Sequence, residues 1–220
     1  MLDHQKRRGM LKVAHNQYGM SLLELMIAIA IGSILLMLGI PSFKSWIQNT
    51  QIRTAAESIL NGLQVARTEA VRKNTNVRFN LTDASGMVAW SVDCETVVPL
   101  QPDGSGCPAG IQSRAGNEGG SNARVGISVT ALPTPILPGY FNTPTGVGAG
   151  LPAGVTFDGL GRVPAKNPDG LTNDDDITWI DVTNAQSATA RRMVIVIQTG
   201  GQIRMCDPAL TLASNPQGCS

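Results

Sequence analysis

The pattern of hydrophobic and polar residues divides the chain into an apolar run, an amphipathic stretch and a region of alternating residues. The apolar run, Met20 to Ile40, has 21 residues and one charged side chain, Glu24. About 20 apolar residues in a helix cross the roughly 30 Å hydrocarbon core of a bilayer. Basic residues precede the run, at Lys6, Arg7, Arg8 and Lys12. Basic flanks stay on the cytoplasmic side, so we expect a single-pass helix over residues 20–41 and export of the rest.

Two simpler interpretations compete with this one. A secretory signal peptide would have a shorter apolar core of about 7–15 residues, followed by small residues at a cleavage site. Here the run ends in Gly39-Ile40-Pro41 and continues as an amphipathic pattern. An ordinary uncleaved anchor explains the length but not Glu24, because a carboxylate at the bilayer centre costs about 2.5–3.5 kcal/mol and normally has a partner. The ordinary anchor remains the alternative at this point.

The amphipathic stretch covers residues 42–75 and keeps a helical period. Its apolar residues recur at intervals of three and four and form one stripe: Ile52, Ala56, Ile59, Leu63, Ala66 and Ala70. One helix is therefore expected from about Ser21 to about Arg72, with a bend near Pro41, whose nitrogen cannot donate to the preceding turn. Such a helix is about 75–80 Å long, too long for one small core to cover. The stripe should pack on the domain that follows.

Residues 76–220 predict a β-rich exported domain with an antiparallel sheet. Period-two, β-branched segments indicate a hairpin over residues 77–81 and 87–92, a tight hairpin over 155–163, and strands over 124–129, 177–182, 192–197 and 202–206. Residues 93–122 and 131–153 are rich in Gly and Pro and are expected to be irregular. The fold class is therefore α+β: a long N-terminal helix, transmembrane in its first half and amphipathic in its second, packed on an antiparallel sheet.

The four cysteines, Cys94, Cys107, Cys206 and Cys219, allow three pairings. The exported side of the membrane is oxidising, and each local pair brackets a loop rich in Pro and Gly. We therefore favour Cys94–Cys107 and Cys206–Cys219, each contributing about 2–3 kcal/mol. A zinc site is the competing interpretation, but the chain lacks a C-x₂₋₄-C knuckle.

The residues before and inside the apolar run resemble the processing motif of type IV prepilins and type II secretion pseudopilins. The segment Gly19-Met20-Ser21-Leu22-Leu23-Glu24 has the Gly, the hydrophobic residue after the cut and the Glu at the fifth mature position. The resemblance implies that a prepilin peptidase removes residues 1–19 as a leader and methylates the new amine of Met20. It also implies that Glu24 pairs with the amine of a neighbouring subunit, and that Pro41 kinks the helix where the family often has a proline.

Composition argues against catalysis. Both histidines, His4 and His15, lie in the leader, so the mature chain would lack the commonest general base and metal ligand. The acidic run Asp174-Asp175-Asp176 is expected to be a solvated loop, with a weak calcium site as the alternative. The formal net charge of +1 indicates no strongly charged partner. We therefore expect a protein that is not an enzyme and has no cofactor and no metal.

Within the pilin class, the body resembles the GspH/FimT/FimU family. The resemblance lies in Phe157-Asp158-Gly159-Leu160-Gly161-Arg162 and in the end from Gly200-Gly201-Gln202-Ile203-Arg204 to Cys219. Relatives of FimT and FimU are low-abundance pilins that help to start pilus assembly, and some FimT-like members bind DNA through Gly-Arg-x-Arg. Here Gln202 replaces the first Arg, while Arg204 matches the second.

The resemblance implies a type IV pilin-like fold and a minor pilin that assembles or primes a pilus. The alternatives are a DNA-binding minor pilin for natural transformation, with Arg204, Arg191 and Arg192 as candidate contacts, and a GspH-type pseudopilin of type II secretion. The expected partners are other pilins through the N-terminal helix, the prepilin peptidase and the inner membrane. The expected location is the inner membrane, with residues 76–220 in the periplasm, and then a pilus or pseudopilus.

Overall fold

The structure is a computed structural model that describes residues 19–102, 106–118, 120–164 and 175–220. Residues 1–18 of the expected leader, and Asp174 of the acidic run, lie outside the described residues. The chain divides into two compact units, with the boundary between Ser42 and Phe43.

One helix, α1 (Leu22–Lys73), forms the N-terminal part of the described chain and confirms the expected long helix. It continues through Pro41 and ends at Lys73, and the positive φ of 47° at Asn74 suits the position after a helix. The NH of Thr75 donates to the carbonyl of Ala70 at 3.2 Å and closes the last turn. All six residues of the predicted stripe are buried, together with Ala55 and Gly62.

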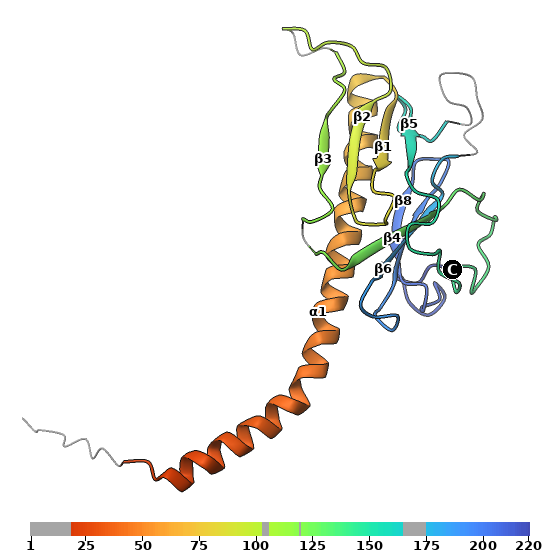
Figure 1. Ribbon diagram of the computed structural model, residues 1–220. Helices are drawn as coiled ribbons and strands as arrows, with labels where there is room; N and C mark the ends of the chain where they lie inside the picture. Colours follow the sequence, from red (N-terminus) through yellow and green to blue (C-terminus); the bar gives the residue numbers. More distant parts are fainter. Residues whose placement is uncertain (1–18, 103–105, 119, 165–174) are drawn as a thin grey trace, which may run out of the picture. The chain divides into compact units, whose positions relative to one another are not determined.

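The first sheet packs on the buried stripe of α1. It contains β1 (Val77–Leu81), β2 (Trp90–Cys94), β3 (Gln112–Arg114) and β5 (Ala153–Phe157), in the antiparallel order β3-β2-β1-β5. In β1 and β2 every second residue is buried, as the alternation predicts. Figure 1 shows these strands side by side along the second half of α1. Contact is close at Gly62, where an added Cβ would lie 2.8 Å from the ring of Phe79.

The second sheet contains β4 (Ala123–Ser128), β6 (Trp179–Asn184), β7 (Met193–Ile197) and β8 (Ile203–Cys206). Its strands follow the antiparallel order β4-β6-β7-β8. Residues 194–197 of β7 are all buried because the sheet is covered on both faces. One face joins the main core with α1, and the other packs on a smaller cluster that includes Phe141, Cys206 and Cys219.

Three expectations about the strands are corrected by the structure. The strands form two four-stranded sheets instead of one, because β5 returns to pair with β1 while β6 pairs with β4. The predicted hairpin over 155–163 is wrong for the same reason: β5 has its partner in β1, and the residues after it form a turn closed by the Asp158 NH and the Arg162 carbonyl at 2.8 Å. The short strand β3 lies within the loop expected over 93–122.

Candidate functional site

The residues around the expected cut lie just before the helix. Gly19, Met20 and Ser21 are exposed and outside α1. The Oγ of Ser21 accepts a hydrogen bond from the NH of Glu24 at 3.1 Å, and the Ser21 carbonyl accepts one from the NH of Leu25 at 3.1 Å. Ser21 is therefore the N-cap of α1, and the peptide bond between Gly19 and Met20 is in exposed, non-helical chain.

The capping role of Ser21 was not among the expectations, although the sequence carries a signal for it. Ser21-Leu22-Leu23-Glu24 has the S-x-x-E spacing of a capping box, in which a serine caps the helix and a glutamate occupies its third position. The cap explains why α1 begins at Leu22. It also places a carboxylate in the first turn, where the helix dipole favours negative charge.

Glu24 is the polar group of this segment that lacks a partner. Among the described residues, no hydrogen bond or ion pair engages its carboxylate. The hydroxyl of Ser33, further along, donates to the carbonyl of Ile29 at 2.7 Å and is satisfied within the helix. The single chain therefore leaves a charge that an apolar surrounding would penalise and that a partner from outside the chain would stabilise.

The large apolar side chains between Met20 and Ile40 are at least half exposed to solvent in the single chain. Within the described residues, α1 is the helix long and apolar enough to cross a bilayer, and its apolar part is not buried by the rest of the chain. Pro41 is also exposed, and the helix assignment continues through it. A kink at Pro41 remains a prediction.

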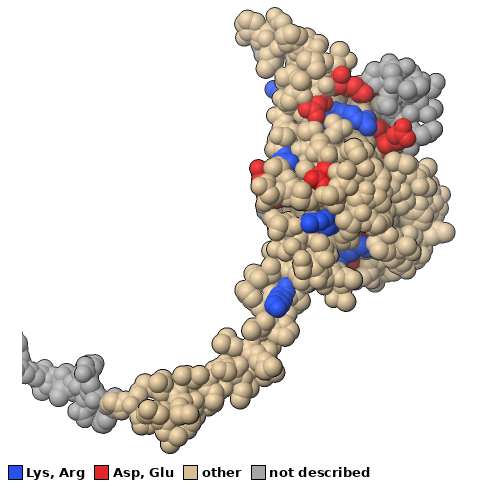
Figure 2. Space-filling view, viewed as in Figure 1, with Lys and Arg blue, Asp and Glu red and all other residues tan. Residues whose placement is uncertain are grey.

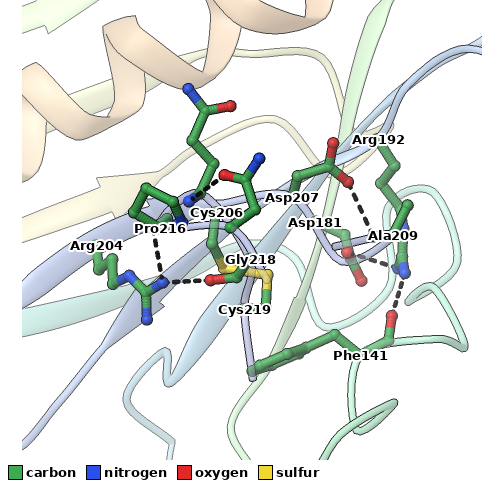
Figure 3. Close-up of a disulfide and its surroundings, with 12 residues drawn as sticks. Phe141, Asp181, Arg192, Arg204, Cys206, Asp207, Ala209, Pro216, Gly218 and Cys219 are labelled. Carbon is green, nitrogen blue, oxygen red and sulfur yellow. Dashed lines mark hydrogen bonds and ion pairs between the residues drawn. A yellow bond between two sulfur atoms is a disulfide. The ribbon is translucent and has the colours of Figure 1, made fainter. Parts of the chain in front are cut away.

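The four cysteines form two disulfides, Cys94–Cys107 and Cys206–Cys219, each between residues 13 positions apart. These are the two local pairs that the sequence favours. Cys94 ends β2, and Cys107 exchanges two backbone hydrogen bonds with Val98, at 2.8 and 2.7 Å. Cys206 ends β8 and ties the C-terminal loop to the second sheet (Figure 3).

Arg192, one of the three candidate DNA contacts, is part of the buried structure. Its side chain is 14% exposed and pairs at 2.8 Å with Asp181, which is 2% exposed. Arg192 also donates to the carbonyl of Phe141 (Figure 3). Burial raises the pKa of Asp181, against the opposing effects of the Thr145 NH and the Arg192 guanidinium. Arg192 therefore holds the loop of Phe141 on β6, and its role as a DNA contact stays a prediction.

Arg191 and Arg204 also have partners within the chain. The Nε of Arg191 pairs with Asp207, which is buried, although the Arg191 side chain is 55% exposed. Arg204 donates to the carbonyls of Pro216, at 3.3 Å, and Gly218, as the dashed lines of Figure 3 show. Thus two of the three arginines are neutralised by Asp181 and Asp207, and the third holds the loop that the Cys206–Cys219 disulfide closes.

The distribution of charge over the surface agrees with a structural role for these arginines. On the face shown in Figure 2, basic and acidic side chains are interspersed over the β-rich unit, and neither sign gathers into a large patch. Binding of DNA without sequence preference depends mainly on several cations that face the phosphates together. On the face shown, the basic side chains do not form such an array.

Arg204 should therefore matter for stability. Replacing Arg204 by alanine removes the donor to two loop carbonyls, and we expect it to lower the free energy of unfolding by about 1–3 kcal/mol. Arg53→Ala is the matched control, because Arg53 is 68% exposed and its pair with Glu57 should contribute less than about 1 kcal/mol. Urea unfolding of the unit Phe43–Ser220 measures both. A DNA gel shift that disappears in Arg204→Ala, with unchanged stability, would contradict the structural role.

The two segments on which the resemblance to the GspH/FimT/FimU family depends, at residues 157–162 and 200–206, lie against each other in the structure. Gly201 has a φ of +77°, and a Cβ added there would lie 1.8 Å from the carbonyl oxygen of Gly161. That same oxygen accepts a hydrogen bond from the Nε of Arg67 on α1 at 3.0 Å. The NH of Val163 donates to the carbonyl of Thr199 at 3.0 Å and fixes the same contact. The glycines of both segments therefore let helix, turn and β7–β8 loop approach closely.

The acidic run is not a solvated loop at its described end. Asp176 is 4% exposed and pairs with Arg78 of β1 at 2.9 Å. Burial raises the pKa of Asp176, and the charge of Arg78 opposes that shift. This carboxylate links the start of β6 to the first sheet, which corrects the expectation for Asp176. Among the described residues, no group of three or more His, Cys, Asp or Glu side chains could hold a metal ion.

Two family models match the sequence. The model for the prokaryotic N-terminal methylation motif matches residues 14–40, and the model for type II transport protein GspH matches residues 55–201. No curated protein sequence matches the chain at a significant level.

Two crystal structures of the type IV minor pilin FimU from Pseudomonas aeruginosa are similar to this chain. One is 16% identical with a TM-score of 0.42 and covers 72% of this chain and 90% of its own. The other is 18% identical with a TM-score of 0.39 and covers 72% of this chain and 94% of its own. The family assignment rests instead on the sequence models: because the GspH model spans residues 55–201 and the methylation motif precedes it, the chain belongs to the GspH family of pilin-like proteins.

Proposed function

We propose that this chain is a minor type IV pilin with a structural role in assembling or priming the pilus. The observation that carries the proposal is Glu24, an unpartnered carboxylate in the first turn of an exposed apolar helix. An ion pair with a neighbouring subunit would satisfy that charge, whereas lipid would not. The partners are therefore other pilins, which contact the chain through residues 20–41.

The proposed path of the chain begins in the inner membrane. The first half of α1 spans the bilayer, residues 42–75 continue the helix outside it, and residues 76–220 fold in the periplasm. A prepilin peptidase cuts between Gly19 and Met20 and methylates the amine of Met20. The methylation motif over residues 14–40 and the exposed position of Gly19 and Met20 support this step.

Processing is tested at Gly19. Replacing Gly19 by leucine puts a bulky side chain at the expected cut, and we expect the purified membrane form to keep its 19-residue leader. Gly32→Ala is the matched control, because Gly32 lies inside α1 and a Cβ there meets no atom within 4 Å. Intact-mass spectrometry measures cleavage, methylation and both disulfides in one spectrum.

The mass result can contradict the proposal in two ways. A wild-type chain that keeps the leader in cells containing the peptidase would remove the pilin assignment. A Gly19→Leu chain that is cut normally would show that the cut lies elsewhere.

The alternative function is a pseudopilin of type II secretion, favoured by the description of the GspH model that matches residues 55–201. A deletion strain separates the two functions. Loss of surface pili with normal exoprotein secretion supports the minor pilin, and the reverse result supports the pseudopilin. A role in DNA uptake is not proposed, because the candidate cations Arg191, Arg192 and Arg204 all have partners within the chain.

The proposed role does not include catalysis or a cofactor. The described carboxylates with raised pKa values, Asp176 and Asp181, are buried in ion pairs with Arg78 and Arg192. The cysteines at both ends of the β-rich unit are committed to disulfides. Neither arrangement leaves a nucleophile or a general base facing a substrate.

A further inference from the structure

An aromatic pair lies on α1 just beyond the apolar segment. Phe43 and Trp46 lie three positions apart and therefore share one helix face. Their ring centroids are 5.8 Å apart with an interplanar angle of 27°, so the rings stack. Both side chains remain strongly exposed, at 61% and 62%. Two large aromatic rings side by side in solvent indicate a surface that another phase or molecule covers.

The rest of the described unit does not cover this pair. The buried stripe of α1 begins only at Ile52, more than one turn after Trp46. Among the described residues the indole NH of Trp46 has no hydrogen-bond partner, whereas the NH of Trp90 in the core donates to the Oγ of Ser58 at 3.1 Å. Trp46 therefore combines an apolar ring with an unused donor.

The position of Phe43 and Trp46 along the helix indicates what covers them. At 1.5 Å per residue, the helical segment from Leu22 to Ile40 is about 28 Å long, close to the thickness of a hydrocarbon core. Phe43 and Trp46 follow within two turns, at the depth where phospholipid headgroups begin. Tryptophan is enriched at that depth because its ring contacts the acyl chains while its NH donates to polar lipid groups. Lys44, also exposed, adds a cation at the level of the phosphates.

We propose that Phe43, Lys44 and Trp46 form a phospholipid-headgroup surface that sets the depth of α1 in the membrane on the exported side before assembly. This proposal rests on the membrane anchoring given under the proposed function. The rings occupy the boundary between headgroups and acyl chains, and the ammonium group of Lys44 contacts lipid phosphate.

The test uses the full chain in vesicles of phosphatidylethanolamine and phosphatidylglycerol. Tryptophan fluorescence is quenched in turn by lipids brominated near the headgroup, by lipids brominated near the chain end, and by aqueous iodide. The difference between wild type and Trp46→Phe isolates the signal of Trp46 from those of Trp90 and Trp179. We expect the Trp46 emission to shift to shorter wavelength in vesicles and to be quenched most strongly by the shallow bromines.

Three outcomes would overturn the proposal while leaving the anchoring intact. The first is strongest quenching of Trp46 by the deep bromines, and the second is quenching by iodide alone. The third is shielding of Trp46 from all three quenchers, which would indicate that a second copy of the chain covers it. Flotation with the vesicles is measured first. A chain that does not float would overturn the membrane anchoring itself, and the headgroup surface with it.

Discussion

A chain carrying Glu24→Ala is expected to enter the membrane normally but to be nearly absent from filaments. Removing a carboxylate from an apolar segment lowers the cost of insertion, since such a charge costs up to about 2.5–3.5 kcal/mol in the bilayer. In a filament the same change would remove the proposed ion pair between subunits and leave the partner's amine unpaired in an apolar core, which is strongly destabilising. The fraction of the subunit in sheared filaments, relative to the membrane, measures the effect on immunoblots.

Two control variants separate charge from packing. Glu24→Gln keeps the size of the side chain without its charge, and we expect it to behave like Glu24→Ala. Ser33→Ala removes a polar group of the same segment whose hydroxyl already bonds to the Ile29 carbonyl at 2.7 Å, so incorporation should stay near wild type. Normal incorporation of Glu24→Ala would show that the unpartnered carboxylate does not drive assembly.

Replacing Gly201 by alanine should produce the largest loss of stability among the single changes considered. Its φ of +77° strains any residue with a Cβ, and the new Cβ would lie 1.8 Å from the Gly161 oxygen. Backbone strain and overpacking each cost about 1–3 kcal/mol, so we expect a loss of roughly 2–5 kcal/mol. For a unit of this size the melting temperature should fall by about 5–15 °C in a thermal unfolding scan.

The neighbouring glycine provides a matched control. Gly200 is exposed, and a Cβ added there meets no atom within 4 Å. Gly200→Ala should therefore change the free energy of unfolding by less than about 0.5 kcal/mol. Equal stabilities for the two variants would mean that Gly161 and Gly201 are not in close contact in solution.

The sequence alone determined the features that depend on neighbouring residues. The 3.6-residue period predicted α1 and its buried stripe from Ile52 to Ala70, because a helix places residues three and four apart on one face. The alternation of apolar and polar residues predicted β1 and β2. It also predicted that they pair, because only a short loop joins them in the sequence. The sequence also contained the processing motif around Gly19 and Glu24, and the methylation-motif model over residues 14–40 confirms it. The S-x-x-E spacing would have revealed the cap at Ser21 as well.

Only the tertiary structure decided which distant segments meet. The pairing of β5 with β1 joins residues 72 to 80 positions apart and splits the strands into two sheets, and no local pattern encodes that choice. The same limit applies to charged residues: Asp176 and Arg192 look like solvated side chains in the sequence, but Arg78 and Asp181 reach them from other strands and make burial favourable. Local periodicity reports the face that a residue occupies, whereas the partner across that face depends on how the whole chain folds.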